Sequence, residues 1–119
     1  MTRRNSAAIG ASAEAAVRVL LTREGWTLLA ANWRGAGGEL DIVASRENVL
    51  RVVEVKARAR ADGSALEAVT RSKQRRITAA TEAFLAAHLD LDFDEINFCV
   101  VTVEGQVVTW YDDAFDACY

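Results

Sequence analysis

Proline is absent from the 119 residues, histidine occurs once and cysteine only twice. The length suits one domain, and without proline there is no stiff spacer, so we expect a single compact domain over residues 1–119. The lone histidine, His88, excludes any catalytic or metal site that needs two histidines. Cys99 and Cys118 lack metal-ligand spacing, and one pair of thiols makes no disulfide framework, so we expect both to be free.

Long apolar runs are also missing. No stretch approaches the roughly 18 residues that a membrane helix needs. The basic N-terminus is not followed by the apolar core and cleavage pattern of a signal peptide. We therefore expect a cytoplasmic protein that does not engage a membrane, with residues 1–5 disordered.

Charge is plentiful but unevenly distributed, and the formal net charge is −3. Residues 51–76 carry eight Lys and Arg against three acids, whereas residues 77–119 carry nine acids and no Lys or Arg. Because the field that a ligand meets is local, the basic segment suits a polyanion although the whole chain is acidic. The acidic segment suits a basic protein partner, so an adaptor function stays open.

Hydrophobic periodicity predicts the secondary structure. Helical spacing covers residues 6–24 and 72–88, and a further helical stretch begins near Ala65. Strand-like runs cover residues 26–34, 39–45, 49–59, 96–103 and 106–110. The GAGG stretch at 35–38 is expected to be a flexible loop, and residues 112–118 a last helical turn. This order, αβββα(β)β, predicts an α/β fold with a central mixed β-sheet flanked by helices.

Two charged strands, GELDIVASRENVLRVVEVKAR, are the most informative stretch. Side chains alternate along a strand, so Glu39 and Asp41 share a face of the first strand, and Glu54 and Lys56 share a face of the second. With a two-residue turn at 47–48, Asp41 lies opposite Glu54 and Glu39 lies opposite Lys56.

Two facing carboxylates repel, by up to about 1 kcal/mol at an exposed site and by more where water is excluded. Lys56 is one cation that could offset this, with Glu39 competing for it. A hard divalent ion is the other, since Mg²⁺ takes one or two carboxylates plus waters and phosphate oxygens. A solvated sheet face with cross-strand ion pairs remains an alternative. Glu14, at the border of the first helix's apolar stripe, is expected to reach the same face.

These residues resemble the metal site of the PD-(D/E)XK nuclease superfamily: Asp41, twelve intervening residues, then Glu54-Val55-Lys56. Glu14 matches the additional helical acid of archaeal Holliday-junction resolvases. The motifs GWTLLAANWR, GELDIVA, VVEVKAR and KQRRI, in this order, also resemble the uncharacterised YraN-like bacterial family over about residues 14–115. One departure is Asn97-Phe98-Cys99 in place of Arg-Phe-Asp. The resemblance implies a restriction-endonuclease-like three-layer fold.

The resemblance further implies Mg²⁺- or Mn²⁺-dependent hydrolysis of DNA phosphodiester bonds, with branched or flapped DNA as candidate substrates. Asp41 and Glu54 would bind the ion, the backbone carbonyl of Val55 would complete its shell, and Glu14 would act directly or through water. Lys56 would orient the attacking water and touch the scissile phosphate.

Residues expected to contact the nucleic-acid backbone are Arg58, Arg71, Lys73, Gln74, Arg75 and Arg76. Two other functions with the same fold stay open: a non-catalytic nucleic-acid-binding module and a protein-interaction adaptor. A homodimer or a partner protein is also expected, because small nucleases of this architecture often need one to grip a duplex.

Overall fold

The computed structural model describes residues 6–57 and 69–119. The elements in chain order are α1 (Ser6–Arg23), β1 (Thr27–Gly35), β2 (Gly38–Arg46), β3 (Val49–Ala57), α3 (Arg71–Ala87), β4 (Glu95–Glu104) and β5 (Val107–Phe115). The order predicted from the sequence is confirmed for these elements. Two expectations, the disordered residues 1–5 and the helical stretch near Ala65, lie outside the described residues.

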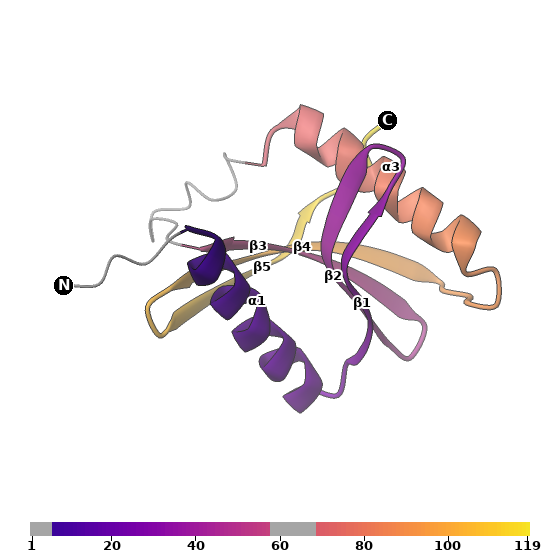
Figure 1. Cartoon of the computed structure of the whole chain (residues 1–119). Coiled ribbons are helices and arrows are strands. Elements are labelled where there is room, and N and C mark those ends of the chain that lie inside the picture. Colours follow the sequence, from indigo (N-terminus) through magenta and orange to yellow (C-terminus); the bar gives the residue numbers. More distant parts are fainter. Residues whose placement is uncertain (1–5, 58–68) are drawn as a thin grey trace.

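One five-stranded sheet, in the order β1-β2-β3-β4-β5, forms the middle layer (Figure 1). Neighbouring strands are antiparallel except β3 and β4, which run parallel, so the sheet is mixed, as predicted. A parallel pair needs a crossover connection, and α3 lies in it. α1 packs on one face and α3 on the other, which gives three layers.

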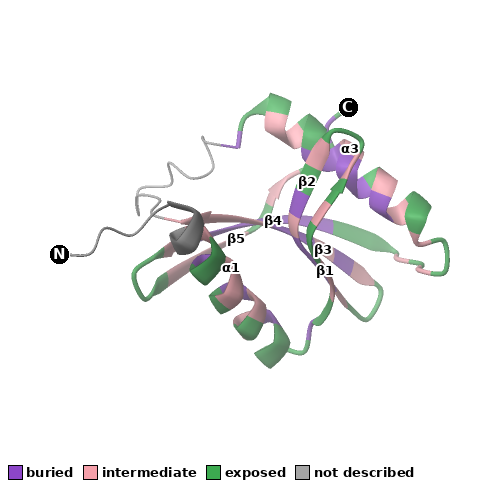
Figure 2. Cartoon of the chain, viewed as in Figure 1, coloured by how far each residue is buried: buried purple, intermediate pink, exposed green. Residues whose placement is uncertain are grey.

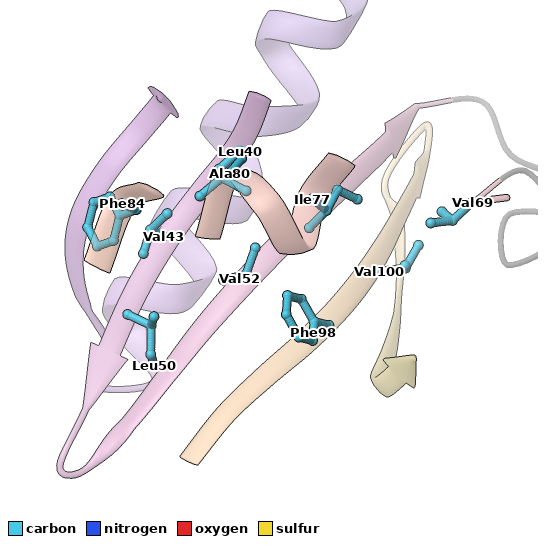
Figure 3. Packing of buried hydrophobic residues seen from close by; sticks show 10 residues of the cluster. All are labelled: Leu40, Val43, Leu50, Val52, Val69, Ile77, Ala80, Phe84, Phe98 and Val100. Carbon is cyan, nitrogen blue, oxygen red and sulfur yellow. The ribbon is translucent and has the colours of Figure 1, made fainter. Parts of the chain in front are cut away.

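Each face of the sheet buries its own apolar cluster. The cluster beneath α3, drawn in Figure 3, joins residues of the sheet to the inner face of the helix: Leu40, Val43, Leu50, Val52, Val69, Ile77, Ala80, Phe84, Phe98 and Val100. The cluster beneath α1 joins the other face of the sheet to that helix: Val17, Leu21, Trp26, Ile42, Ala44, Val53, Cys99 and Val101. Burying a Val, Leu or Phe side chain contributes about 1.5–3 kcal/mol. Figure 2 shows β4, which supplies residues to both clusters, buried along much of its length.

α3 begins and ends at identifiable caps. The Thr70 hydroxyl accepts the Lys73 N–H at 3.3 Å and so caps the start of the helix. At the other end, His88 is the C-cap residue and donates from Nδ1 to the carbonyl of Phe84 at 2.7 Å. Among the described residues, neither helix has the length and apolar character needed to cross a bilayer.

The β2–β3 hairpin turns at residues 47–48, as predicted. Arg46 pairs with Val49, and the register continues to Ile42 opposite Val53. The predicted register is therefore confirmed as far as Ile42. The expected pairings of Asp41 with Glu54 and of Glu39 with Lys56 do not form, because the ladder ends at Ile42 and Val53.

The β1–β2 hairpin turns more tightly than expected. Gly35 pairs with Gly38, so only Ala36 and Gly37 form the turn, with φ of 52° and 77°. The expected flexible loop at 35–38 is thus a two-residue turn. A Cβ atom on Gly38 would collide with the backbone carbonyl of Arg76 on α3. Glycine there lets the tip of the hairpin pack directly on the helix backbone.

The end of the chain differs from its prediction. Residues 112–118 are not a helical turn, because β5 continues to Phe115, which pairs with Phe98 and stacks on its ring at 4.9 Å. Beyond β5, the N–H of the buried Cys118 donates to Thr78 Oγ1 of α3 at 2.9 Å. Cys99 and Cys118 are both buried and free, as expected.

Candidate metal and nucleic-acid site

β2 separates from β3 at Asp41. The last paired residues are Ile42 and Val53, and just beyond them the Val55 N–H donates to Asp41 Oδ2 at 2.8 Å. The carboxylate therefore replaces a backbone acceptor at the end of the ladder. Because the N–H and C=O of one strand residue point to the same side, the Val55 carbonyl also points toward the strand that carries Asp41.

Strand alternation breaks at the same point. Leu40 lies in the cluster beneath α3 together with Val43, although their odd spacing should place them on opposite faces. On β1, Asn32 lies opposite Asp41 in an unshifted register but is not paired with it, and it has a φ of 51°. We call this local irregularity of the two strands the kink; the Asp41 side chain is turned there along the sheet toward β3.

Glu54 and Lys56 lie on the α3 face of β3, which they share with the buried Val52. Lys56 Nζ lies 3.6 Å from Glu54 Oε1, and the two side chains are 23% and 19% exposed. Glu39 does not compete for Lys56 in this arrangement, because its Oε2 lies 3.6 Å from Nη2 of Arg34.

Asp41 and Glu54 carry like charges in partly buried surroundings. Burial raises the pKa of Asp41 from 3.8 to about 6, opposed by the Val55 N–H and Lys56 and reinforced by the charge of Glu14. Burial and then the charge of Asp41 raise the pKa of Glu54 from 4.5 to about 7, opposed by Lys56. The charge of Asp41 therefore acts on Glu54, and a cation bound by both carboxylates would relieve this repulsion.

Glu14 approaches from a direction that the sequence did not indicate. α1 covers the face opposite Glu54, so Glu14 acts on Asp41 from the other side of the kink. Across residues 6–57 and 69–119, no three His, Cys, Asp or Glu side chains form a group that could hold a metal ion. The groups that could donate to a cation here are Asp41, Glu54 and the Val55 carbonyl, and its other positions would go to water and ligand oxygens. Mg²⁺ accepts such a set.

A cleft of about 710 Å³ opens beside Glu54, between the tip of the β1–β2 hairpin and the first turns of α3. Its charged lining residues are Arg34, Glu39, Glu54, Lys73 and Arg76. The nearby charge of Lys56, followed by burial, lowers the pKa of Lys73. The ammonium groups of Lys56 and Lys73 therefore repel each other, next to the carboxylates of Asp41 and Glu54, which also repel each other.

The basic residues predicted to bind nucleic acid divide by position. Lys73 and Arg76 line the cleft. Arg71 and Arg75 are exposed on α3 and are not among the lining residues. Arg58 lies outside the described residues.

Two side chains near the cleft differ from the expectation in opposite ways. Gln74, predicted to contact nucleic acid, is half-buried and donates from Nε2 to the carbonyl of Val69 at 3.0 Å. Arg34, which the sequence analysis did not name, lines the cleft. The signal was present, because a two-residue turn at Ala36-Gly37 places Arg34 directly opposite Glu39.

The other face of β3 carries Arg51, whose charge has partners within the protein. Arg51 points toward α1, where its Nη1 lies 3.3 Å from Asp112 Oδ1. Its guanidinium lies 4.4 Å from the centre of the Trp26 ring, and that of Arg46 lies 4.6 Å from the same ring. Arg51 is therefore held within the protein by an ion pair and an aromatic contact.

The positions that depart from the YraN-like pattern lie next to Arg51. Asn97, its neighbour on β4, donates from Nδ2 to Asp113. The Cys99 thiol lies 3.7 Å from Asp112, and burial raises its pKa to about 12, so it stays protonated. Cys99 belongs to the cluster beneath α1, on the face away from the cleft, so the departure does not alter the cleft.

Comparison with known proteins shows that the chain is similar to one protein family. The model of the family described as "Uncharacterised protein family UPF0102" matches residues 13–103. A UPF0102 protein of Synechococcus sp. (strain JA-3-3Ab) is 45% identical over 98 residues, which are 81% of this chain and 75% of that protein. A UPF0102 protein of Rhodopseudomonas palustris (strain ATCC BAA-98 / CGA009) is 38% identical over 109 residues, 91% of this chain and 83% of that protein. The matched range includes Glu14, Asp41, Glu54, Lys56 and Lys73.

Proposed function

This chain belongs to the UPF0102 family, the YraN-like family that its motifs resemble, and we propose that it is a Mg²⁺- or Mn²⁺-dependent nuclease of the PD-(D/E)XK superfamily with a restriction-endonuclease-like fold. Its substrate is DNA, with branched or flapped structures as candidates. The names of the relatives state no activity, so the proposal depends on the site itself.

The observation that carries the proposal is that two pairs of like charges lie side by side, one pair of carboxylates and one pair of amines. Asp41 and Glu54 repel each other, as do the neighbouring Lys56 and Lys73. Each arrangement costs free energy in the protein alone. A divalent cation at the carboxylates and phosphate oxygens at the amines would relieve both, and a phosphodiester with its metal ion brings the two together.

The residues of the site suit distinct roles in hydrolysis. Asp41, Glu54 and the Val55 carbonyl would hold the ion. When bound, such an ion lowers the pKa of a coordinated water and neutralises charge on the phosphoryl oxygens. Asp41 Oδ2 accepts the Val55 N–H, and the carboxylate has further lone pairs that could bind a cation.

The remaining groups would act on the water and the substrate. Lys56, held by Glu54, orients the water and contacts the scissile phosphate. Glu14 acts on Asp41 from the α1 side. Lys73 and Arg76 neutralise backbone phosphates, which gives salt-sensitive binding without sequence preference. One small cleft contacts only part of a duplex, so we include a second copy or a partner protein in the proposal for duplex substrates.

The test is a panel of single-stranded, duplex, flapped and four-way DNAs with Mg²⁺ or Mn²⁺. Asp41→Asn and Glu54→Gln keep the side-chain shapes and remove the charges, and we expect each to lower cleavage by about 100-fold or more. Glu24→Gln, an exposed acid at the end of α1, is the matched control and should cleave normally. Inertness of the wild type on every DNA, or normal cleavage by the double variant, would refute the proposal.

A non-catalytic nucleic-acid-binding module is the second candidate. It is favoured by the lack of a converging group of three acidic, His or Cys ligands in the described part of the chain. This alternative predicts DNA binding that is independent of divalent metal, with no product from any substrate. A protein-interaction adaptor predicts no salt-sensitive DNA binding at all. Measuring both binding and cleavage on the same DNA panel therefore separates the nuclease, the binding module and the adaptor.

A further inference from the structure

Arg34 and Glu39 form an exposed ion pair at the mouth of the cleft. They pair across the β1–β2 hairpin, with Nη2 and Oε2 3.6 Å apart and side chains 80% and 40% exposed. Exposed pairs of this kind hold their partners weakly, because water screens the attraction. The guanidinium is therefore available to a stronger anion.

The hairpin tip holds Arg34 in a fixed place relative to α3. Gly38 packs against the backbone carbonyl of Arg76, so the hairpin and the helix form two walls of one cleft. Arg34 and Arg76 are the guanidinium groups of this lining. Lys56 and Lys73 instead lie beside Glu54, where the scissile phosphate would sit.

We propose that Arg34 and Arg76 form a second phosphate subsite that takes a phosphate next to the scissile one, and that Glu39 is the counter-ion which Arg34 releases as nucleic acid enters. This deepens the proposed function and rests on it. The substrate class that follows is a polynucleotide with at least two consecutive phosphates rather than a mononucleotide.

The chemistry favours this assignment over a metal-binding role for Glu39. A guanidinium binds a phosphate through two parallel hydrogen bonds, which a single exposed carboxylate at 3.6 Å does not match. Glu39 pairs with Arg34, whereas Glu54 pairs with Lys56, so the two acids of the cleft have different cationic partners. The volume of about 710 Å³ also exceeds what one phosphate group fills.

The experiment measures binding of a fluorescent single-stranded oligonucleotide by anisotropy over a range of salt, with Ca²⁺ in place of Mg²⁺. Arg34→Gln should weaken binding about 3- to 10-fold and reduce the salt slope by about 0.7, the value for one phosphate contact on a single strand. Arg23→Gln makes the same charge change at the end of α1, away from the cleft, and should leave the slope unchanged. Arg34→Lys should recover part of the affinity.

Glu39→Gln should change oligonucleotide binding in the opposite direction to Arg34→Gln. Without its counter-ion, Arg34 is free for phosphate, so oligonucleotide binding should tighten about 2- to 5-fold at low salt. Mn²⁺ affinity, measured by calorimetry without DNA, should not change.

Two results would overturn the subsite: equal effects of Arg34→Gln and Arg23→Gln on the salt slope, or loss of Mn²⁺ affinity in Glu39→Gln. If the wild type binds no oligonucleotide, the proposed function fails together with the subsite. If the wild type binds and cleaves, and Asp41→Asn is inactive, but Arg34→Gln binds normally, the subsite alone fails.

Discussion

The two faces of β3 treat charge in opposite ways. On the α1 face, Arg51 meets Asp112 and the Trp26 ring, so its charge is balanced within the protein. On the α3 face, Glu54 and Lys56 balance each other but each has a neighbour of its own sign. A charge balanced internally stabilises the fold, whereas a group crowded by like charges is completed only by a ligand. The comparison separates, on a single strand, charge that the protein balances from charge that we propose a ligand balances.

The largest expected effect is a loss of stability on the α1 face of β3, where Arg51 is paired. Arg51→Met removes the ion pair and the aromatic contact, and leaves Asp112 without its partner. We expect the free energy of unfolding to fall by about 2–3 kcal/mol. Urea denaturation measures this loss. DNA binding by the folded variant should be normal, and weakened binding would break the division between the faces.

The next effect is a pH dependence of stability that comes from Asp41 and Glu54. The pKa values of Asp41 and Glu54 are raised to about 6 and about 7, so the folded state binds protons more tightly than the unfolded state. Their contribution to stability is therefore present in acid and is lost as pH rises through these values. One pKa unit corresponds to about 1.4 kcal/mol, and each carboxyl group is raised by about two units, so we expect a loss of a few kcal/mol over this pH range.

Comparison of wild type with Glu54→Gln isolates this contribution, because the other titrating groups cancel. The variant should be more stable than the wild type at about pH 8, and the difference should shrink below about pH 5. Mg²⁺ should raise the melting temperature of the wild type at high pH and that of the variant much less. A variant less stable than the wild type at high pH would contradict the idea of crowded carboxylates.

The smallest effect concerns the wall of the cleft. Gly38→Ala places a methyl group against the Arg76 carbonyl, so the hairpin tip must move away from α3. We expect a loss of about 1–2 kcal/mol in stability, with weaker DNA binding. Gly10→Ala is the matched control, because it meets no atom within 4 Å inside α1 and should add about 0.5–1 kcal/mol. Unchanged DNA binding in Gly38→Ala would show that the wall does not shape the site.

Much of the fold followed from local pattern. The two-residue turn at 47–48 fixes the β2–β3 register, and alternation assigns Val52 and Val53 to opposite faces. The length of β5 did not follow, because Asp112 and Asp113 are typical of a polar turn. These residues stay in the strand through partners on other strands, Arg51 and Asn97, which no local pattern reveals.

The candidate site was predictable in composition but not in geometry. Spacing was enough to single out Asp41, Glu54 and Lys56. The kink that turns Asp41 toward Val55 depends on the left-handed backbone of Asn32 across the hairpin. Which face of the sheet α1 covers depends on tertiary packing, so the sequence alone does not indicate the direction from which Glu14 approaches Asp41.

The contact between Cys118 and Thr78 ties the end of the chain to the cleft. Cys118 lies beyond residues 13–103, the range that the family model matches, yet its N–H donates to the helix that carries Lys73 and Arg76. The position of α3, and with it the spacing between these basic residues and the hairpin tip, therefore depends in part on a residue outside the matched range.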